Sequence, residues 1–334
     1  MTHNQIQNIC ESLNLGYPIS PPTRVYGGLL HLMWRLDTDT GSYAIKQLSK
    51  DIHLSEATIK QYELTENIAR QFATHGIPAV SSLRKNGKSL IYTGENTFII
   101  YPWKKAEMIE NDAINILHAT KIASLLAKMH LLHLSVPGIT KPTYDTFSSN
   151  ELIIVLIEKS VEAFLPFADK LQNSKAMLLE ANEQYQQAIP ILNQSLVISH
   201  ADLDPKNVLW DENNNPFLID WESARALNST SEILNAALDW SGVTTCSIDQ
   251  DIFIAMITAY KKAGGIINAK DLDAFFDGIP GYCVHWMVYN IQRSLGMKGS
   301  TLEDKTIGIE QVNQVLQVIY YLNDTKDELI KLAY

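Results

Sequence analysis

Residues 198–207 of the chain read ISHADLDPKN, and residues 219–222 read IDWE. An apolar run leads into the first segment, and the turn-rich residues 211–216 separate the two, which predicts a strand, a loop and a hairpin. A loop after one strand and a carboxylate at the end of the next hairpin would bring Asp202 and Asp220 to the same edge of a cleft. The two segments therefore predict one polar site.

The polar side chains of these segments match the needs of phosphoryl transfer from a nucleotide. That reaction requires a carboxylate to orient the attacking hydroxyl and oxygen ligands to hold magnesium against the phosphates. Asp202, Asn207 and Asp220 supply such a set. Mg²⁺ prefers carboxylate and carbonyl oxygens and keeps several waters, so one Asp and one Asn beside a nucleotide suffice. The alternative is that each aspartate serves only a turn or a helix cap.

Upstream of these segments, the sequence predicts a small unit of antiparallel strands with one helix. Apolar stretches at 25–36 and 42–48 flank the turn residues DTDTG, which is typical of a hairpin. A helix is expected from an N-cap at Ser55 to the stop signal that begins at His75. Two further strands are expected on either side of the turn KNGK at residues 85–88, followed by a third apolar run at Thr97 to Tyr101.

The remainder of the chain has the periodicity of helices. From residue 111 onward, apolar positions and His130 fall on one helical stripe, which makes that histidine a core residue. Helical patterns continue over residues 151–188 until Pro190 ends them, and they return from about Ser231 to the C-terminus. The second part is therefore expected to be mainly helical.

The pattern His200-x-Asp202-x4-Asn207, followed by Asp220-Trp221-Glu222, resembles the aminoglycoside phosphotransferase and choline kinase-like family, which is related to protein kinases. The resemblance implies that Asp202 is the catalytic base, that Asn207 and Asp220 bind magnesium, and that His200 buttresses the loop. Position 201 carries alanine where many relatives carry glycine, an exchange expected to be sterically mild.

The same resemblance extends to the first part of the chain. Residues 43–46, YAIK, look like the strand whose lysine, here Lys46, holds the α- and β-phosphates of ATP. They lie one hairpin after a glycine pair that includes Gly28. The acidic partner of this lysine is expected on the following helix, where Glu63 and Glu66 are both possible and Glu66 is favoured.

Residues 98–103, FIIYPW, look like the strand and hinge that would meet the adenine edge with backbone groups of Tyr101 and Trp103. The implied fold class is α+β, a bilobal protein-kinase-like fold with a small antiparallel sheet plus one helix and a large, mainly helical C-lobe. The implied division is residues 1–101 as the nucleotide-binding lobe, 102–110 as the hinge and 111–334 as the helical lobe with the catalytic loop.

Composition bounds the function further. The 334 residues suit roughly two structural units, and 37 acidic against 27 basic residues give a formal charge of −10. Nucleic acid is therefore a poor partner, and no apolar run is long enough to span a bilayer. The three cysteines, Cys10, Cys246 and Cys283, suit neither a disulfide framework nor a zinc site. With no export signal visible, we expect a cytoplasmic protein.

The sequence therefore predicts transfer of the γ-phosphoryl group of ATP, or of GTP, with magnesium, to a hydroxyl of a small molecule such as an aminoglycoside or an amino alcohol. The acidic composition favours a cationic acceptor. Candidate pocket residues are Asp204, Glu222, Asp239, Asp249, Trp240 and Trp286, although solvated surface for the acids and core packing for the tryptophans are the simpler interpretations. A regulatory pseudokinase and a Ser/Thr protein kinase are alternatives, and the short segment from Trp221 to Ser231 disfavours the latter. The oligomeric state stays open.

Overall fold

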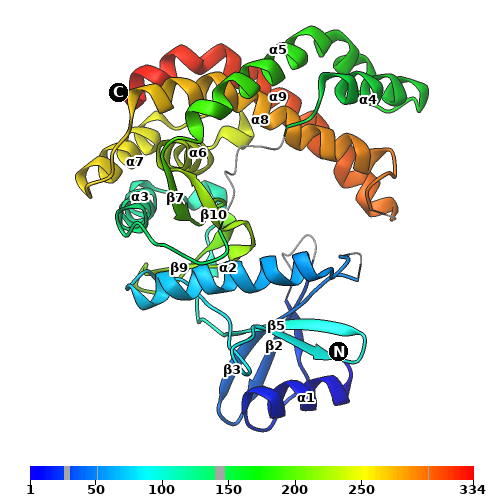
Figure 1. Ribbon diagram of the computed structural model, residues 1–334, viewed down its shortest axis with the longest axis vertical. Helices are drawn as coiled ribbons and strands as arrows, with labels where there is room; N and C mark the ends of the chain where they lie inside the picture. The colour runs from blue at the N-terminus through cyan, green and yellow to red at the C-terminus, as the bar shows by residue number, and fades with distance from the viewer. Residues whose placement is uncertain (26–30, 51, 140–146, 300) are drawn as a thin grey trace. The chain divides into compact units, whose positions relative to one another are not determined.

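The computed structural model describes residues 1–25, 31–50, 52–139, 147–299 and 301–334. The chain forms two compact units (Figure 1). The first combines Met1–Ile109 with Leu134–Gly138 and His200–Arg225, and the second combines Glu110–His133 with Ile139–Ser199 and Ala226–Tyr334. The α+β class is confirmed, because a sheet dominates the first unit and helices dominate the second. The segment that carries the polar motifs belongs to the first unit.

A five-stranded antiparallel sheet forms the first unit, with the strand order β1-β2-β3-β5-β4. The predicted hairpin is present. Its strands β2 and β3 pair along their length, from Leu32 opposite Gln47 to Thr38 opposite Gly41 at the turn. β5 then pairs with β3 on one side and β4 on the other. The strand bounds are Thr23–Val25 for β1, Leu32–Thr38 for β2, Gly41–Gln47 for β3, Leu90–Thr93 for β4 and Asn96–Pro102 for β5.

The predicted helix is α2, Glu56–Thr74, and both of its ends lie where the sequence signals place them. The Ser55 side chain accepts a hydrogen bond from the backbone N–H of Thr58, which satisfies one of the free donors of the first turn. Gly76, at φ +80°, follows the last turn in a conformation that glycine adopts without strain. Helix α2 buries Ile68, Ala69 and Phe72.

A second helix in this unit, α1 at His3–Leu13, corrects the expectation of a single helix. Thr2 and Gln5 form a capping box, each bonding the other's backbone N–H. The apolar residues of α1 are isolated in sequence, yet Ile6 and Ile9 are buried in the same cluster as the sheet residues Leu36 and Phe98. The helical spacing of these apolar residues and their burial against the sheet together stabilise α1.

The strand expected before the turn at residues 85–88 is absent from the described chain there, and only β4 follows the turn. Leu83 donates one backbone hydrogen bond to Ile100 of β5, at 2.7 Å. The neighbouring N–H of Ser82 donates to the Glu66 carboxylate instead of to a strand. A side chain of α2 therefore competes with the sheet for this segment.

The motif segment is attached to the rest of the first unit by a small sheet with the order β6-β8-β9. Leu218 of β9 exchanges backbone hydrogen bonds with Pro78 and Val80, each 2.9 Å long, just after α2. The ring of Trp221 lies 5.3 Å from that of Phe72 on α2. These contacts fix residues 200–225 against α2. The strand bounds are Glu107–Met108 for β6, Val208–Trp210 for β8 and Pro216–Leu218 for β9.

Buried apolar side chains of α4, α5, α8 and α9 form one core cluster of the second unit, and Figure 1 labels these four helices. The helical pattern over residues 151–188 is two helices, and Pro190 lies inside the last turn of α5 instead of ending it. Gly281 lets α8 approach α5 closely, because a Cβ there would lie 2.2 Å from the carbonyl oxygen of Ala181. The helix bounds are Ile116–Leu131 for α3, Asn150–Glu162 for α4, Ala168–Leu192 for α5, Ser229–Ser241 for α6, Gln250–Lys262 for α7, Ala269–Ser294 for α8 and Leu302–Ala333 for α9.

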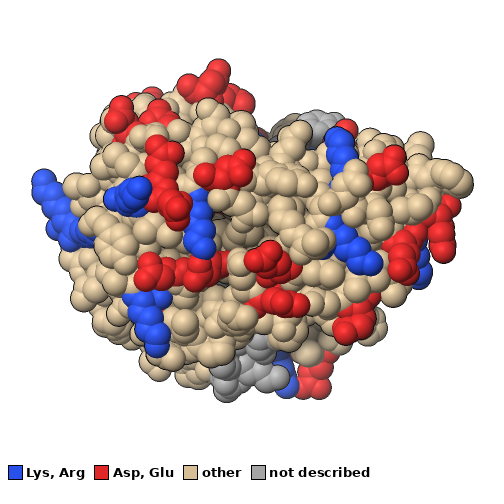
Figure 2. Space-filling model, turned by 90° about the horizontal axis from the view of Figure 1, so that it is seen from above, with Lys and Arg blue, Asp and Glu red and all other residues tan. Residues whose placement is uncertain are grey.

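Two short strands, β7 at Leu196–Ser199 and β10 at Arg225–Asn228, form a separate two-stranded sheet. His130 of α3 is a core residue as predicted. Its Nδ1 lies 2.7 Å from the Tyr260 hydroxyl, and its Nε2 lies 2.7 Å from the Glu232 carboxylate. Within the described parts of the chain, every helix is too short or too polar to cross a membrane. On the face drawn in Figure 2, acidic and basic side chains are interspersed.

Candidate active site

The loop after β7 is held by His200, whose side chain is fully buried. Its Nε2 lies 2.9 Å from the carbonyl oxygen of Ile219, and its ring packs 4.5 Å from that of Trp221. Because a carbonyl only accepts, Nε2 carries the proton. His200 thereby joins the two motif segments and has the buttressing contacts that the resemblance implies. The following residue, Ala201, has φ +65°, a left-handed conformation that turns the chain towards Asp202.

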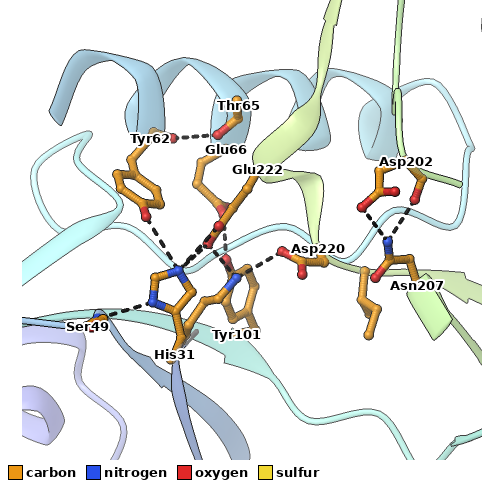
Figure 3. A network of polar contacts seen from close by, with 12 residues as sticks. His31, Ser49, Tyr62, Thr65, Glu66, Tyr101, Asp202, Asn207, Asp220 and Glu222 are labelled. Carbon is orange, nitrogen blue, oxygen red and sulfur yellow. Dashed lines mark hydrogen bonds and ion pairs between the residues drawn. The ribbon is translucent and has the colours of Figure 1, made fainter. Parts of the chain in front are cut away.

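Asp202 and Asn207 are joined directly (Figure 3). The Asn207 amide nitrogen donates to the backbone oxygen of Asp202 at 2.8 Å and to its carboxylate at 3.0 Å. Both donors of a buried amide group are thus used on one residue, which leaves the amide oxygen as the free polar atom of Asn207. The carboxylate of Asp202 is fixed in orientation by the same contact.

Asp220 lies next to this pair because of backbone pairing. The N–H of Ile219 donates to the carbonyl oxygen of Asn207 at 3.0 Å, so the residue after Ile219 is placed beside Asn207. Asp220 itself has φ 58° and ψ 63°, a left-handed conformation that Asp tolerates better than most residues. In Figure 3, Asp220 lies between Glu222 and the pair formed by Asp202 and Asn207. Lys46 lies against the same residue, with its ammonium 2.9 Å from the Asp220 carboxylate.

Lys46 projects from β3 into a buried position and is held by two carboxylates. Its ammonium nitrogen lies 2.9 Å from Asp220 Oδ1 and 2.5 Å from Glu222 Oε1. Burial alone would lower the pKa of Lys46, but the charges of Asp220 and Glu222 outweigh it and raise that pKa above its ordinary value. Lys46 is therefore a fixed positive charge at neutral pH.

Glu222 is the second carboxylate on Lys46 and was expected only as a pocket or surface residue. Burial alone would raise the pKa of its carboxyl, but a hydrogen bond from His31 and the charge of Lys46 lower that pKa to about 2. Both carboxylate oxygens lie 3.3 Å from His31 Nε2. Glu222 is thus ionised at neutral pH, and its carboxylate contacts both Lys46 and His31. Glu222 belongs to the motif Asp220-Trp221-Glu222, whereas no motif marks His31, and only the chain fold brings the two side chains together.

The expected partners of Lys46 on α2 make other contacts. Glu66 accepts a 2.5 Å hydrogen bond from the Tyr101 hydroxyl and one from the Ser82 N–H, and it forms no ion pair with Lys46 within 4.0 Å. Burial raises the pKa of the Glu66 carboxyl, although its hydrogen bonds and the nearby Lys46 charge oppose this. Glu63 accepts the backbone N–H groups of Ser89 and Leu90. The assignment of Glu66 as the ion-pair partner is therefore corrected to Asp220 and Glu222.

Of the remaining predicted nucleotide contacts, Tyr101 and Trp103 make hydrogen bonds within the protein. Gly28 lies outside the described residues. Tyr101 directs its hydroxyl to Glu66, and burial raises the pKa of that hydroxyl well above its ordinary value. Trp103 donates its backbone N–H to the carbonyl oxygen of Ser42 at 3.0 Å, and the Arg35 guanidinium lies 4.9 Å from its ring. The N–H of Trp103 is thus used by the sheet rather than left for a ligand.

The donor set suits a hard divalent cation bound together with phosphates. Among the described residues there is no group of three or more His, Cys, Asp or Glu side chains that could hold a metal alone. The amide oxygen of Asn207 and the carboxylate of Asp220 are oxygen ligands, and Mg²⁺ completes its shell with water and substrate phosphate oxygens. The residues therefore fit magnesium delivered with a nucleotide better than a resident metal.

Sequence comparison decides the family. The phosphotransferase enzyme family matches residues 23–263, more than half of the chain. The chain belongs to this family. It is accordingly a small-molecule phosphotransferase, an enzyme that moves a phosphoryl group to a hydroxyl. No curated protein sequence matches it significantly.

Solved structures show the same fold. A spectinomycin phosphotransferase, APH(9)-Ia, in complex with ADP and spectinomycin is 14% identical, with a TM-score of 0.69 over 95% of this chain and 98% of that one. The choline kinase LicA from Streptococcus pneumoniae is 15% identical, with a TM-score of 0.60 over 93% and 98%. An amicoumacin kinase in complex with AMP-PNP and Ca²⁺ is 12% identical, with a TM-score of 0.65 over 94% and 96%. At these identities the likeness establishes the protein-kinase-like fold.

Proposed function

We propose that the enzyme transfers the γ-phosphoryl group of ATP to a hydroxyl of a small molecule, with Mg²⁺ as cofactor. The observation that carries the proposal is the ion pair between buried Lys46 and Asp220, set beside the hydrogen-bonded pair of Asp202 and Asn207. A cation, a metal-binding carboxylate and a fixed carboxylate in one place are the parts that positional and electrostatic catalysis of phosphoryl transfer requires. ADP and AMP-PNP in the similar structures support a nucleotide donor.

Each residue has a defined task in this proposal. Lys46 binds phosphate oxygens, and its fixed charge offsets theirs. Asp220 and the amide oxygen of Asn207 hold Mg²⁺, which would neutralise charge on the phosphates when bound. Asp202, whose carboxylate is oriented by the Asn207 amide, accepts a hydrogen bond from the acceptor hydroxyl and takes its proton. The hydroxyl oxygen is thereby directed at the phosphorus atom.

We infer the backbone groups for adenine from the register of β5, within the expected hinge, residues 102–110. Because Trp103 directs its N–H towards β3, the neighbouring carbonyl of Pro102 points to the opposite side. On that side, the preceding carbonyl of Ile100 is already occupied by the N–H of Leu83. The next N–H on that side belongs to Lys104. We therefore propose that the carbonyl of Pro102 and the N–H of Lys104 contact adenine, in place of the backbone groups of Tyr101 and Trp103.

The acceptor is proposed to be a cationic hydroxyl compound. In the second unit, Tyr282, Trp286 and Tyr289 lie on one face of α8 and are 43%, 47% and 40% exposed. The rings of Trp286 and Tyr289 are stacked, with centroids 5.3 Å apart. Trp286 is thus exposed rather than packed in the core. Trp240, by contrast, is buried core. Choline kinase and spectinomycin phosphotransferase among the similar structures support amine-bearing acceptors.

The test is ATP consumption in a screen of hydroxyl compounds, with GTP compared as donor. We expect Asp202→Asn to lower kcat by about 10²- to 10⁴-fold, the range of general acid-base catalysis, without abolishing MgATP binding. The matched control is Asp112→Asn, because Asp112 is an exposed residue of a 3-10 turn in the other unit. Full activity of Asp202→Asn would refute the assigned mechanism. Binding without turnover by the unaltered enzyme would instead indicate a regulatory pseudokinase.

A further inference from the structure

Lys46, the lysine proposed to bind the nucleotide phosphates, has its acidic partners outside α2. Lys46 has two carboxylate partners, and both come from the loop after β9. In the proposed function, Asp220 is a magnesium ligand, so its charge is shared with the metal once the nucleotide is bound. Glu222 is then the carboxylate that still acts on Lys46 alone. Its 2.5 Å contact is also the shorter of the two.

The glutamates of α2 are committed elsewhere. Glu66 is 3% exposed and receives hydrogen bonds from the Tyr101 hydroxyl and the Ser82 N–H. Glu63 caps the backbone N–H groups that open β4. Moving either carboxylate onto Lys46 would leave its hydrogen-bond donors unpaired, which is unfavourable for buried polar groups. The structure therefore resists an ion pair between α2 and Lys46.

His31 fixes the orientation of Glu222. The backbone N–H of Ser49 donates to His31 Nδ1 at 3.2 Å, so Nδ1 is the unprotonated nitrogen and Nε2 carries the proton. That Nε2–H donates to the Glu222 carboxylate at 3.3 Å (Figure 3). The Tyr62 hydroxyl lies 3.5 Å from the same nitrogen. With 5% of its surface exposed, His31 has little freedom to turn.

The hairpin of β2 and β3 links these groups mechanically. His31 directly precedes β2, and Lys46 is in β3 directly opposite Met33. Ser49 follows β3. The imidazole thus holds Glu222 beside the hairpin that carries Lys46, so the carboxylate and the ammonium are positioned by neighbouring parts of the chain. A carboxylate so fixed sets the direction in which the lysine side chain points.

We propose that Glu222, oriented by the Nε2–H of His31, is the positioning partner of Lys46 on the nucleotide phosphates, in place of a glutamate of α2. This inference rests on the proposed function of Lys46. His31 is a positioning residue that acts through Glu222 and does not touch the nucleotide. Because Lys46 binds phosphates in the ground state as well as in the transition state, losing its orientation weakens nucleotide binding more than it slows the chemical step.

The test compares three substitutions of His31 by calorimetric titration with MgADP and by steady-state kinetics. His31→Ala is expected to raise the Kd for MgADP and the KM for ATP about tenfold, with kcat lowered less than about threefold. In His31→Gln the side-chain amide N–H reaches the place of Nε2 and is expected to restore most of the affinity. In His31→Asn the shorter amide does not reach it and restores none. His75→Gln, an exposed histidine at the end of α2, is the matched control.

The outcomes separate the inference from the proposed function. If the unaltered enzyme binds MgADP and His31→Ala binds it equally well, or if Gln and Asn behave alike, the inference is overturned and the proposed function stands. A larger loss of affinity in Glu66→Gln than in Glu222→Gln would overturn it too. If the unaltered enzyme binds neither MgADP nor MgATP, the proposed function fails and the inference fails with it. Should His31→Ala not fold, the comparison of Gln with Asn decides.

Discussion

The backbone conformation of residue 201 allows a prediction about the stability of the protein. Ala201 has φ +65°, a conformation that costs a residue with a Cβ about 1–2 kcal/mol relative to the right-handed region. Glycine avoids this cost but loses about 0.4–1 kcal/mol through the greater entropy of its unfolded chain. Ala201→Gly is therefore expected to raise the free energy of unfolding by roughly 0.5 kcal/mol. Denaturant titration measures it.

The control is the same exchange in the second motif segment. Ala224 has φ −57° and is buried, so Ala224→Gly is expected to lower the free energy of unfolding by about 1 kcal/mol. Equal effects of the two exchanges would show that the backbone conformation at position 201 is not strained. The expectation of a sterically mild exchange at this position is thus refined, because conformation rather than space distinguishes alanine from glycine there.

The sequence separation of two residues decides whether their contact at the site could be predicted. Asp202 and Asn207 are five residues apart, and their contact follows from one loop, so spacing alone brings them together. The contact of His31 with Glu222 spans 191 positions and depends on how two segments dock. Glu66 is misassigned for the same reason, because helix register places it near Lys46 but cannot reveal that Tyr101 and Ser82 occupy its carboxylate.

Among the elements, helix α9 has the clearest terminal signal. Thr301 and Asp304 form a capping box, and Arg293 of α8 contacts the same Asp304 carboxylate at 2.6 Å. Hydrogen bonds from Thr301 and Arg293 lower the pKa of Asp304 well below its ordinary value. Its stabilisation is therefore complete above about pH 4 and is lost as the pH falls through the lowered pKa.

Asp304→Ala is accordingly expected to lower the free energy of unfolding by about 1 kcal/mol at neutral pH, because the cap is lost. The difference from the unaltered protein should shrink progressively below about pH 4. Denaturant titrations at several pH values measure this. The matched control is Glu303→Ala, since Glu303 lies in the same first turn without the Thr301 and Arg293 contacts. A difference that stays constant down to pH 2 would contradict the role of ionised Asp304.

Elements with local signals were predictable, and a strand that depends on tertiary packing was not. The hairpin of β2 and β3 has its turn residues in sequence, and α2 has an N-cap and a glycine stop. Helix α1 was equally predictable, because Ile6, Ile9 and Leu13 recur at helical spacing and Thr2 forms a capping box with Gln5. The strand expected before the turn at residues 85–88 fails because Ser82 bonds to Glu66. A tertiary contact decided the case of this strand.

At the scale of the whole molecule, the chain returns to its first unit after building part of the second. Residues 200–225 carry Asp202, Asn207 and Asp220, and they group with the first 109 residues rather than with the helices around them in sequence. Lys46 thereby meets its carboxylates within one compact unit. The sequence order of strands and helices predicts the fold class but not this grouping, since it depends on backbone pairing of Leu218 with Pro78 and Val80.

This grouping predicts where nucleotide binding stabilises the protein. MgADP at 100 times its Kd stabilises the binding-competent folded state by roughly 2.7 kcal/mol. Amide exchange that requires this state to open is then slowed roughly 100-fold. We expect the gain in hydrogen-exchange protection to be largest in β3 and in residues 200–222, and smaller in α9, because only the first two carry the proposed ligands. ADP with EDTA should reproduce little of it, since Asp220 and Asn207 act through magnesium. Protection confined to α9 and the other helices of the second unit would contradict both the proposed ligands and their placement in one unit.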